Sequence, residues 1–130
     1  MSQSNGPAYD LFVMYKLPKD FDPGFFVGLA LEQVCFSENQ VSLHFGREVG
    51  ISVESALSHV KGDEPVIAVE VPLFESDLML LLGHVVRRAS ASADGTLTLS
   101  FDNQHVLSVY DTSDQYESYQ IHRGTQVIIV

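Results

Sequence analysis

Several short runs of the chain alternate apolar and polar residues, the pattern of a strand with one face in a core and the other in water. The clearest runs are residues 41–45 and 96–101, and each is followed, after a polar turn, by a second apolar run at 49–53 or 106–110. Asp94-Gly95 precedes the run at 96–101 and is a strong hairpin signal, because Gly tolerates the positive φ of tight turns. The pattern predicts antiparallel strands joined by short turns.

The remaining segments are less uniform. Residues 55–60 predict either one short helical turn or an excursion from the sheet, and residues 76–82 are the best helix candidate. In that candidate Ser76 or Asp77 can cap a run of leucines that Gly83 ends. Further apolar runs of strand type, with only brief pairing expected for the fourth, lie at residues 9–17, 66–71, 84–93, 119–121 and 126–130.

The two halves of the chain, residues 8–72 and 73–130, resemble each other in sequence. Gly28 matches Gly83, and further residues recur at a nearly constant offset: Leu43 and Leu99, Phe45 and Phe101, Ile51 and Leu107, Ser52 and Ser108, Val53 and Val109. Duplication explains this, and so does coincidence, since any two hairpins share the same alternation. Two such antiparallel meanders can bury their apolar faces against each other. We therefore predict a mainly β fold of two similar halves, as a sandwich or a partly open barrel, with one short helix near residues 76–82.

Length and composition indicate one folded domain. The chain has 130 residues, of which 45% are hydrophobic, enough for a core without disulfide or metal staples. We predict a disordered tail at residues 1–7 and a single β domain at residues 8–130.

The charge excludes some partners. The chain carries 17 acidic and 7 basic residues, a formal net charge of −10. A nucleic-acid binder needs a basic surface, and so does a protein held on an anionic membrane, so we expect neither. The acidity serves solubility or matches a basic partner.

The compartment follows from the single cysteine and the lack of a secretory signal. Cys35 has no intrachain partner, and a reducing environment fits a chain without disulfides. The start of the chain is polar, and the longest apolar run, residues 78–82, is too short to cross a bilayer. We expect a cytoplasmic protein.

The second half resembles a bacterial domain family of unknown function. The resemblance is carried by residues 81–86, 94–101 and 114–121, above all by Tyr116-Glu117-Ser118-Tyr119. Tyr119 stands where that family usually has Trp, and Arg123-Gly124-Thr125 replaces its usual Pro-Gly-Gly step. The resemblance implies no activity, cofactor or substrate. Small acidic proteins of this kind resemble partners in bacterial competition systems.

The candidate binding residues come from three places in the sequence. Glu117 is flanked by Tyr116 and Tyr119, and we expect it to pair with an arginine. His44 is the one histidine on a clear polar strand face, and Phe25 and Phe26 adjoin the turn at Asp22-Pro23-Gly24. No catalytic motif, metal-ligand spacing or cofactor fingerprint occurs, so we expect no catalytic residue, no metal and no cofactor.

Three functions stay open. The leading one is a non-enzymatic protein-interaction module, which the apolar last strand could pair into a homodimer. The second is an acidic immunity or inhibitor-type protein that caps a basic partner. The third is a small-ligand carrier or an enzyme with a pocket between the halves, where His44, Glu117 and Tyr119 would be the first suspects.

Overall fold

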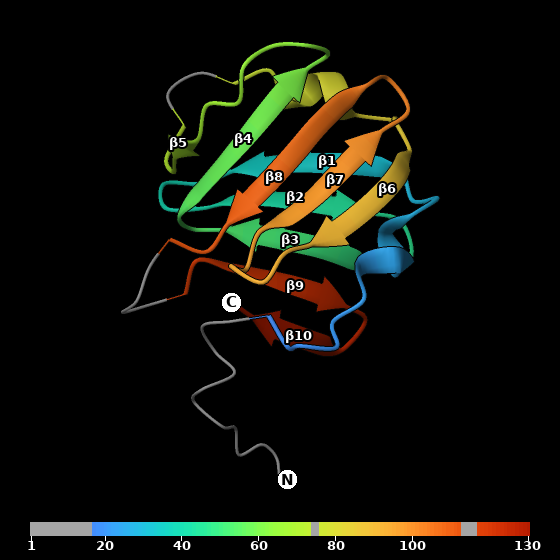
Figure 1. The fold of residues 1–130 in the computed structure, drawn as a ribbon, viewed down its shortest axis with the longest axis vertical. Helices are drawn as coiled ribbons and strands as arrows, with labels where there is room; N and C mark the ends of the chain where they lie inside the picture. Colours follow the sequence, from blue (N-terminus) through green and yellow to red (C-terminus); the bar gives the residue numbers. More distant parts are fainter. Residues whose placement is uncertain (1–16, 74–75, 113–116) are drawn as a thin grey trace, which may run out of the picture.

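In the part of the chain that the structure describes, two antiparallel sheets of five strands make up the fold (Figure 1). The computed structural model describes residues 17–73, 76–112 and 117–130. The first sheet has the order β1 (Leu31–Phe36), β2 (Val41–Phe45), β3 (Val49–Val53), β9 (Tyr119–Arg123), β10 (Gln126–Ile129). The second has the order β5 (Val69–Glu70), β4 (Ala56–Lys61), β8 (His105–Tyr110), β7 (Leu97–Phe101), β6 (Val86–Ala91).

The sheets form a sandwich, in which the strands of one layer run across those of the other (Figure 1). The described strands do not close into a barrel, although an isolated bridge between Ala30 and Val85 joins the layers at one corner. The expected mainly β fold is thus confirmed, and of the two architectures predicted it is the sandwich.

The two similar halves are interlocked. The first half supplies β1, β2 and β3 to one sheet and then crosses, through Glu54 and Ser55, to add β4 and β5 to the other. The second half does the reverse, with β6, β7 and β8 in one sheet and β9 and β10 in the other. The register agrees as well, since β1 is irregular between Leu31 and Gln33 and β6 between Val86 and Arg88. Strands β3 and β9 therefore correspond to β8 and β4.

The helix expected near residues 76–82 is a single 3-10 turn, η3 (Leu78–Leu81). Leu78 and Leu81 are buried, but the next residues leave the turn, because Gly83 donates its backbone N–H to Leu31 O at 2.8 Å. Pairing with the other half thus ends the helix early. The equivalent turn in the first half is η2 (Pro23–Phe26).

The expectation for residues 55–60 is wrong, because they form β4, a strand of the second sheet. Strand β4 pairs with β8 over six residues and with β5 over two. Residues 119–121, expected to pair only briefly, belong to β9, which lies between β3 and β10. Of the run at 66–71 only Val69–Glu70 pairs, whereas residues 1–16, with the tail and most of the strand expected at 9–17, lie outside the described residues.

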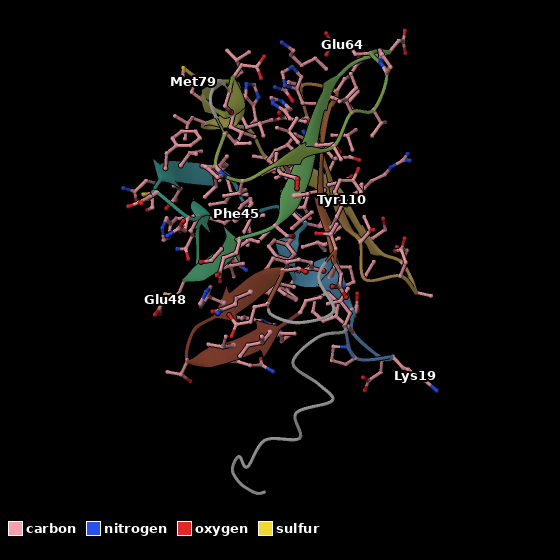
Figure 2. The ribbon with its side chains drawn as sticks, turned by 90° about the vertical axis from the view of Figure 1, so that its left-hand side faces the viewer. Lys19, Phe45, Glu48, Glu64, Met79 and Tyr110 are labelled. Carbon is pink, nitrogen blue, oxygen red and sulfur yellow. The ribbon has the colours of Figure 1, made fainter. Side chains whose placement is uncertain are left out.

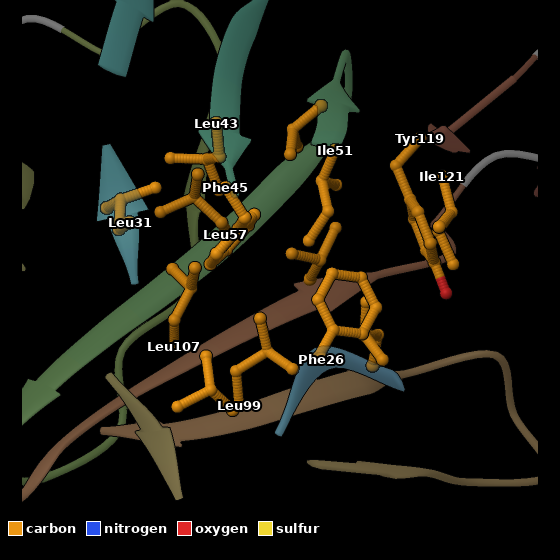
Figure 3. Close-up of a cluster of buried hydrophobic side chains, with 14 of the residues drawn as sticks. Phe26, Leu31, Leu43, Phe45, Ile51, Leu57, Leu99, Leu107, Tyr119 and Ile121 are labelled. Atoms are coloured by element: carbon orange, nitrogen blue, oxygen red, sulfur yellow. The ribbon is translucent and has the colours of Figure 1, made fainter. Parts of the chain in front are cut away.

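Both halves contribute to one hydrophobic cluster between the sheets. Figure 3 shows Leu43 and Ile51 from the first sheet facing Leu99 and Leu107 from the second, with Phe26 of η2 at their side. All five side chains are buried. Fully burying a side chain of this size contributes about 1.5–3 kcal/mol, so this shared cluster holds the layers together.

Candidate functional site

A cavity of about 380 Å³ opens between β4, the chain that follows it, and η3. It lies at the end of the molecule where Figure 2 labels Glu64 and Met79, away from Lys19. Six of the ten residues that line it are apolar and four are polar, so apolar walls stand beside groups that can orient a ligand. The residues that line it are Leu57, His59, Glu64, Pro65, Ile67, Val69, Leu73, Ser76, Asp77 and Leu78.

Two histidines meet beside this cavity. His59 Nε2 of β4 lies 2.9 Å from His105 Nδ1 of β8, and the two rings are tilted with centroids 5.0 Å apart. The side chain of His59 is only 6% exposed. One imidazole can therefore donate to the other, with the roles set by the tautomer.

Asp77, the residue before η3, faces the same imidazole. Its Oδ1 lies 3.1 Å from His59 Nδ1, and its Oδ2 binds the ammonium of Lys61. The hydrogen bond from Lys61 holds the pKa of Asp77 below its usual range. Burial lowers the pKa of His59, against the opposing effect of Asp77. The site thus combines a charged carboxylate with a neutral imidazole.

His59 Nδ1 is buried and makes no aligned hydrogen bond to any described residue. Its 3.1 Å approach to Asp77 Oδ1 is within ion-pair distance, but the poor alignment leaves the polar atom unsatisfied. Buried polar atoms without a partner are rare and costly. An unsatisfied atom beside a cavity is therefore a reason to expect a ligand there.

The other half of the chain shows which of these residues the fold itself requires. In the β3–β9 pair, Val49 lies opposite Arg123 and Ile51 opposite Ile121. In the equivalent β8–β4 pair, His105 lies opposite Lys61 and Leu107 opposite His59. His59 and His105 therefore occupy the positions that the other half fills with Ile121 and Val49, both buried. Because an apolar pair satisfies the same fold, packing alone does not account for the two histidines.

Exposed apolar residues concentrate on the segments that supply the cavity walls. Nine large apolar residues are exposed in the described chain, and six of them lie between residues 66 and 82. These six, which we call the apolar rim, are 44–67% exposed and lie on the segments that also supply the cavity walls Ile67, Val69 and Leu78. The apolar rim consists of Val66, Ile67, Val69, Met79, Leu80 and Leu82.

The residues proposed from the sequence lie elsewhere. Phe26 is buried in the core, and Phe25 is half-buried and stacked on it with ring centroids 4.6 Å apart. The guanidinium carbon of Arg123 lies 4.4 Å from the centre of the Phe25 ring, where a cation–π contact is favourable. Phe25 also borders a smaller cavity of about 280 Å³.

Tyr119 is buried, and its hydroxyl donates to Gly95 O at 2.7 Å; burial raises the pKa of Tyr119. We expected Glu117 to pair with an arginine, but among the described residues it does not. It accepts from Gln120 Nε2 at 2.6 Å and lies beside Glu54. Burial, followed by the charge of Glu117, raises the pKa of Glu54. Tyr116 lies outside the described residues.

His44 is exposed on β2 and lines a third hollow, of about 390 Å³, on the outer face of the first sheet. Gly50 lies opposite His44 on one side and opposite His122 on the other. Thus His44, Glu117 and Tyr119 do not line the cavity at β4, and sequence reasoning missed His59, His105 and Asp77. The repeat is the signal that could have found the two histidines. Once β4 is identified as a strand, His59 and His105 align with Ile121 and Val49 of the other half.

Two further findings concern metals and membranes. Within residues 17–73, 76–112 and 117–130, no three or more His, Cys, Asp or Glu side chains come together in a group that could hold a metal ion. Over the same residues, no helix has the length and apolar character needed to span a bilayer.

Fold and site together define a class, an all-β domain of two interlocked halves with a cavity at one end. The model of the family of unknown function DUF6188 matches residues 25–130, and the chain belongs to that family. The match takes in both halves, whereas the resemblance in the sequence was confined to the second. No curated protein and no solved structure matches the chain.

Proposed function

We propose that this domain is a non-enzymatic binding module that holds a segment of another protein at the β4 cavity and the apolar rim. The observation that carries the proposal is the spread of exposed apolar surface beyond the cavity itself. Met79, Leu80 and Leu82 do not line the cavity, yet they are exposed. A ligand small enough to fill about 380 Å³ would leave them in water, whereas a protein segment would cover them.

The cavity and the rim supply the two parts of a protein interface. Binding energy concentrates where a large side chain fills a desolvated pocket, and surrounding contacts exclude water from it. The cavity has the volume for one such anchor side chain, with Ile67, Val69 and Leu73 as walls. The apolar rim then supplies the surrounding contacts.

The chemistry of the lining favours binding over catalysis. Ser76 has the only hydroxyl among the lining residues, and its Oγ already accepts from Leu78 N at 3.1 Å. A nucleophile needs a base within hydrogen-bond reach, but the polar neighbours of His59 are His105 and Asp77. Within this proposal we place the protein in a reducing cytoplasm, as its single cysteine suggests.

The experiment is a selection of random peptides on the purified chain, followed by affinity measurement by fluorescence anisotropy. The double variant I67S/L80S should bind the selected peptides at least about tenfold more weakly, because it removes apolar contact area. The matched control is Val27→Ser, which changes an exposed apolar residue next to η2, and it should bind like wild type. Peptides that bind I67S/L80S as tightly as wild type would refute the proposed surface.

A homodimer is a separate part of the proposal. Strand β10 is the last strand of its sheet within the described part of the chain, and Val127 on it is exposed. Such an edge can pair with a second copy. A native mass spectrum of the purified chain tests this, since a dimer mass supports the pairing and a monomer mass at micromolar concentration contradicts it.

A further inference from the structure

We propose that the anchor taken by the β4 cavity is a basic side chain, an arginine or a lysine, whose charged head binds Asp77. This inference rests on the proposed function and names the chemistry of the partner. The first observation is that Asp77 does not cap its turn, whereas Asp22, its counterpart in the other half, does. Asp22, before η2, caps its own turn by accepting from Gly24 N at 2.8 Å. Asp77, before η3, makes no side-chain capping bond, and its carboxylate turns to Lys61 and His59.

The second observation is that the polar groups at the cavity are mostly acceptors. Asp77 and Glu64 both line it and bring carboxylate oxygens to it. Glu64 Oε1 accepts from the backbone N–H of Lys61 at 3.1 Å, which leaves its second oxygen for another donor. His59 Nδ1 lies 3.1 Å from Asp77 Oδ1 beside them. Lys61 is one cation against these two carboxylates, so a guanidinium or ammonium group supplies a second positive charge and further donors.

The walls suit the rest of a basic side chain. Lys and Arg have apolar stems that pack along apolar surface while the charged head reaches polar groups. Ile67, Val69 and Leu73 supply that surface on the way to Asp77. The net charge of −10 acts in the same direction, because it attracts basic segments before contact.

Lys61 is the cation that this chain itself places against Asp77. Its ammonium already binds Asp77, and both side chains stay partly exposed, at 38% and 44%. Exposed ion pairs of this kind are weak, so a partner cation that is desolvated in the cavity can replace Lys61. In the other half the equivalent basic residue, Arg123, stacks on Phe25. Among the described residues it does not hold a carboxylate that a partner cation could take over.

The test uses the full chain and the peptides selected on it, with three variants. Selected peptides should share an Arg or Lys, and replacing that residue by Ala should weaken binding at least about tenfold. The isosteric change D77N should weaken it similarly, whereas the matched change D22N in the other half should leave it unchanged. Lys61→Gln should strengthen binding several-fold, because it removes the competing cation. Affinity should also fall as salt is raised.

The results separate the inference from the proposed function. Peptides that depend on Ile67 and Leu80, yet carry no basic residue and bind D77N and wild type equally, would overturn the inference and leave the binding surface in place. Weaker binding by K61Q would also overturn it, because Lys61 would then be a contact rather than a competitor. Peptides indifferent to Ile67 and Leu80 would overturn the surface and the inference together. Melting temperatures of all variants show whether each is folded.

Discussion

Asp22 and Asp77 stand at the same position, one residue before each 3-10 turn, but only Asp22 caps its turn. Asp77 instead lies within 3.1 Å of a buried histidine and binds a lysine. The two halves share a fold, so the fold does not require this difference. Comparing equivalent positions within one chain thus separates residues that build the sandwich from those that build the cavity.

The two aspartates should differ in their effect on stability. Asp22→Ala removes an N-cap acceptor and should lower the free energy of unfolding by about 0.5–1 kcal/mol. Asp77→Ala removes no cap and breaks an exposed ion pair, so its effect should stay within about 0.5 kcal/mol. Urea unfolding of the two variants measures the difference. An Asp77→Ala loss larger than that of Asp22→Ala would contradict the assignment of roles.

The histidine pair should be replaceable by the apolar pair of the other half. The double variant H59I/H105V places Ile and Val where the equivalent strands have Ile121 and Val49. We expect the free energy of unfolding to rise by about 1 kcal/mol, because the buried side chain of His59 and the half-buried His105 are both replaced by apolar ones. His59→Ile alone should lower it by about 1 kcal/mol, since His105 loses its hydrogen-bond partner. Thermal and urea unfolding measure both, and additive effects of the single changes would refute the coupling.

Stability should depend on pH through His59. Burial lowers the pKa of folded His59 below its usual 6.5; His105 and Lys61 act in the same direction and Asp77 opposes them. The unfolded chain therefore takes up this proton first as the pH falls. The contribution of His59 is complete above its usual pKa, and it is lost as the pH falls through the lowered folded pKa. Urea unfolding between about pH 8 and about pH 5 should show this loss in wild type and not in H59I/H105V. An identical pH profile for both would contradict it.

Tyr119 should behave as a structural residue. Tyr119→Phe removes the hydroxyl that donates to Gly95 O and keeps the buried ring. The free energy of unfolding should fall by about 1–2 kcal/mol, because a buried acceptor loses its donor. Peptide binding at the β4 cavity should not change, since Tyr119 does not line it. Tyr119→Phe with wild-type stability and lost binding would show the opposite role.

Glu117 should affect how stability depends on pH in the acidic range, through its neighbour Glu54. Burial and Glu117 raise the pKa of Glu54 above its usual 4.5. This contribution to stability is present below the usual pKa and is lost as the pH rises through the raised folded pKa. Glu117→Gln removes the neighbouring charge, so less stability should be lost between about pH 4 and about pH 7 than in wild type. Unfolding curves across that range test this. If Glu117→Gln loses as much stability as wild type, burial alone raises the pKa of Glu54.

The strand pattern, the acidity and the similarity of the halves could all be read from the sequence. Alternation identified β2 and β7, and Asp94-Gly95 marked the turn between β6 and β7. These features depend on neighbours in the chain, so local physics determines them. The share of hydrophobic residues, 45%, also indicated two layers, because a single meander cannot bury its apolar face alone.

The cavity was decided by tertiary structure. Residues 55–60 lack a clear alternation, and Ala56–Lys61 become β4 because β8, whose paired residues lie 44 to 54 positions later, offers a partner edge. Only that pairing brings His59 to His105 and sets both at positions that are apolar in the other half. The helix predicted near residues 76–82 was shortened in the same way, since Gly83 pairs with Leu31 across the molecule. The sequence by itself determined which residues prefer a strand with one buried face. Which strands meet, and so which polar groups share a cavity, depended on contacts between residues far apart in the chain, and a local pattern does not encode those contacts.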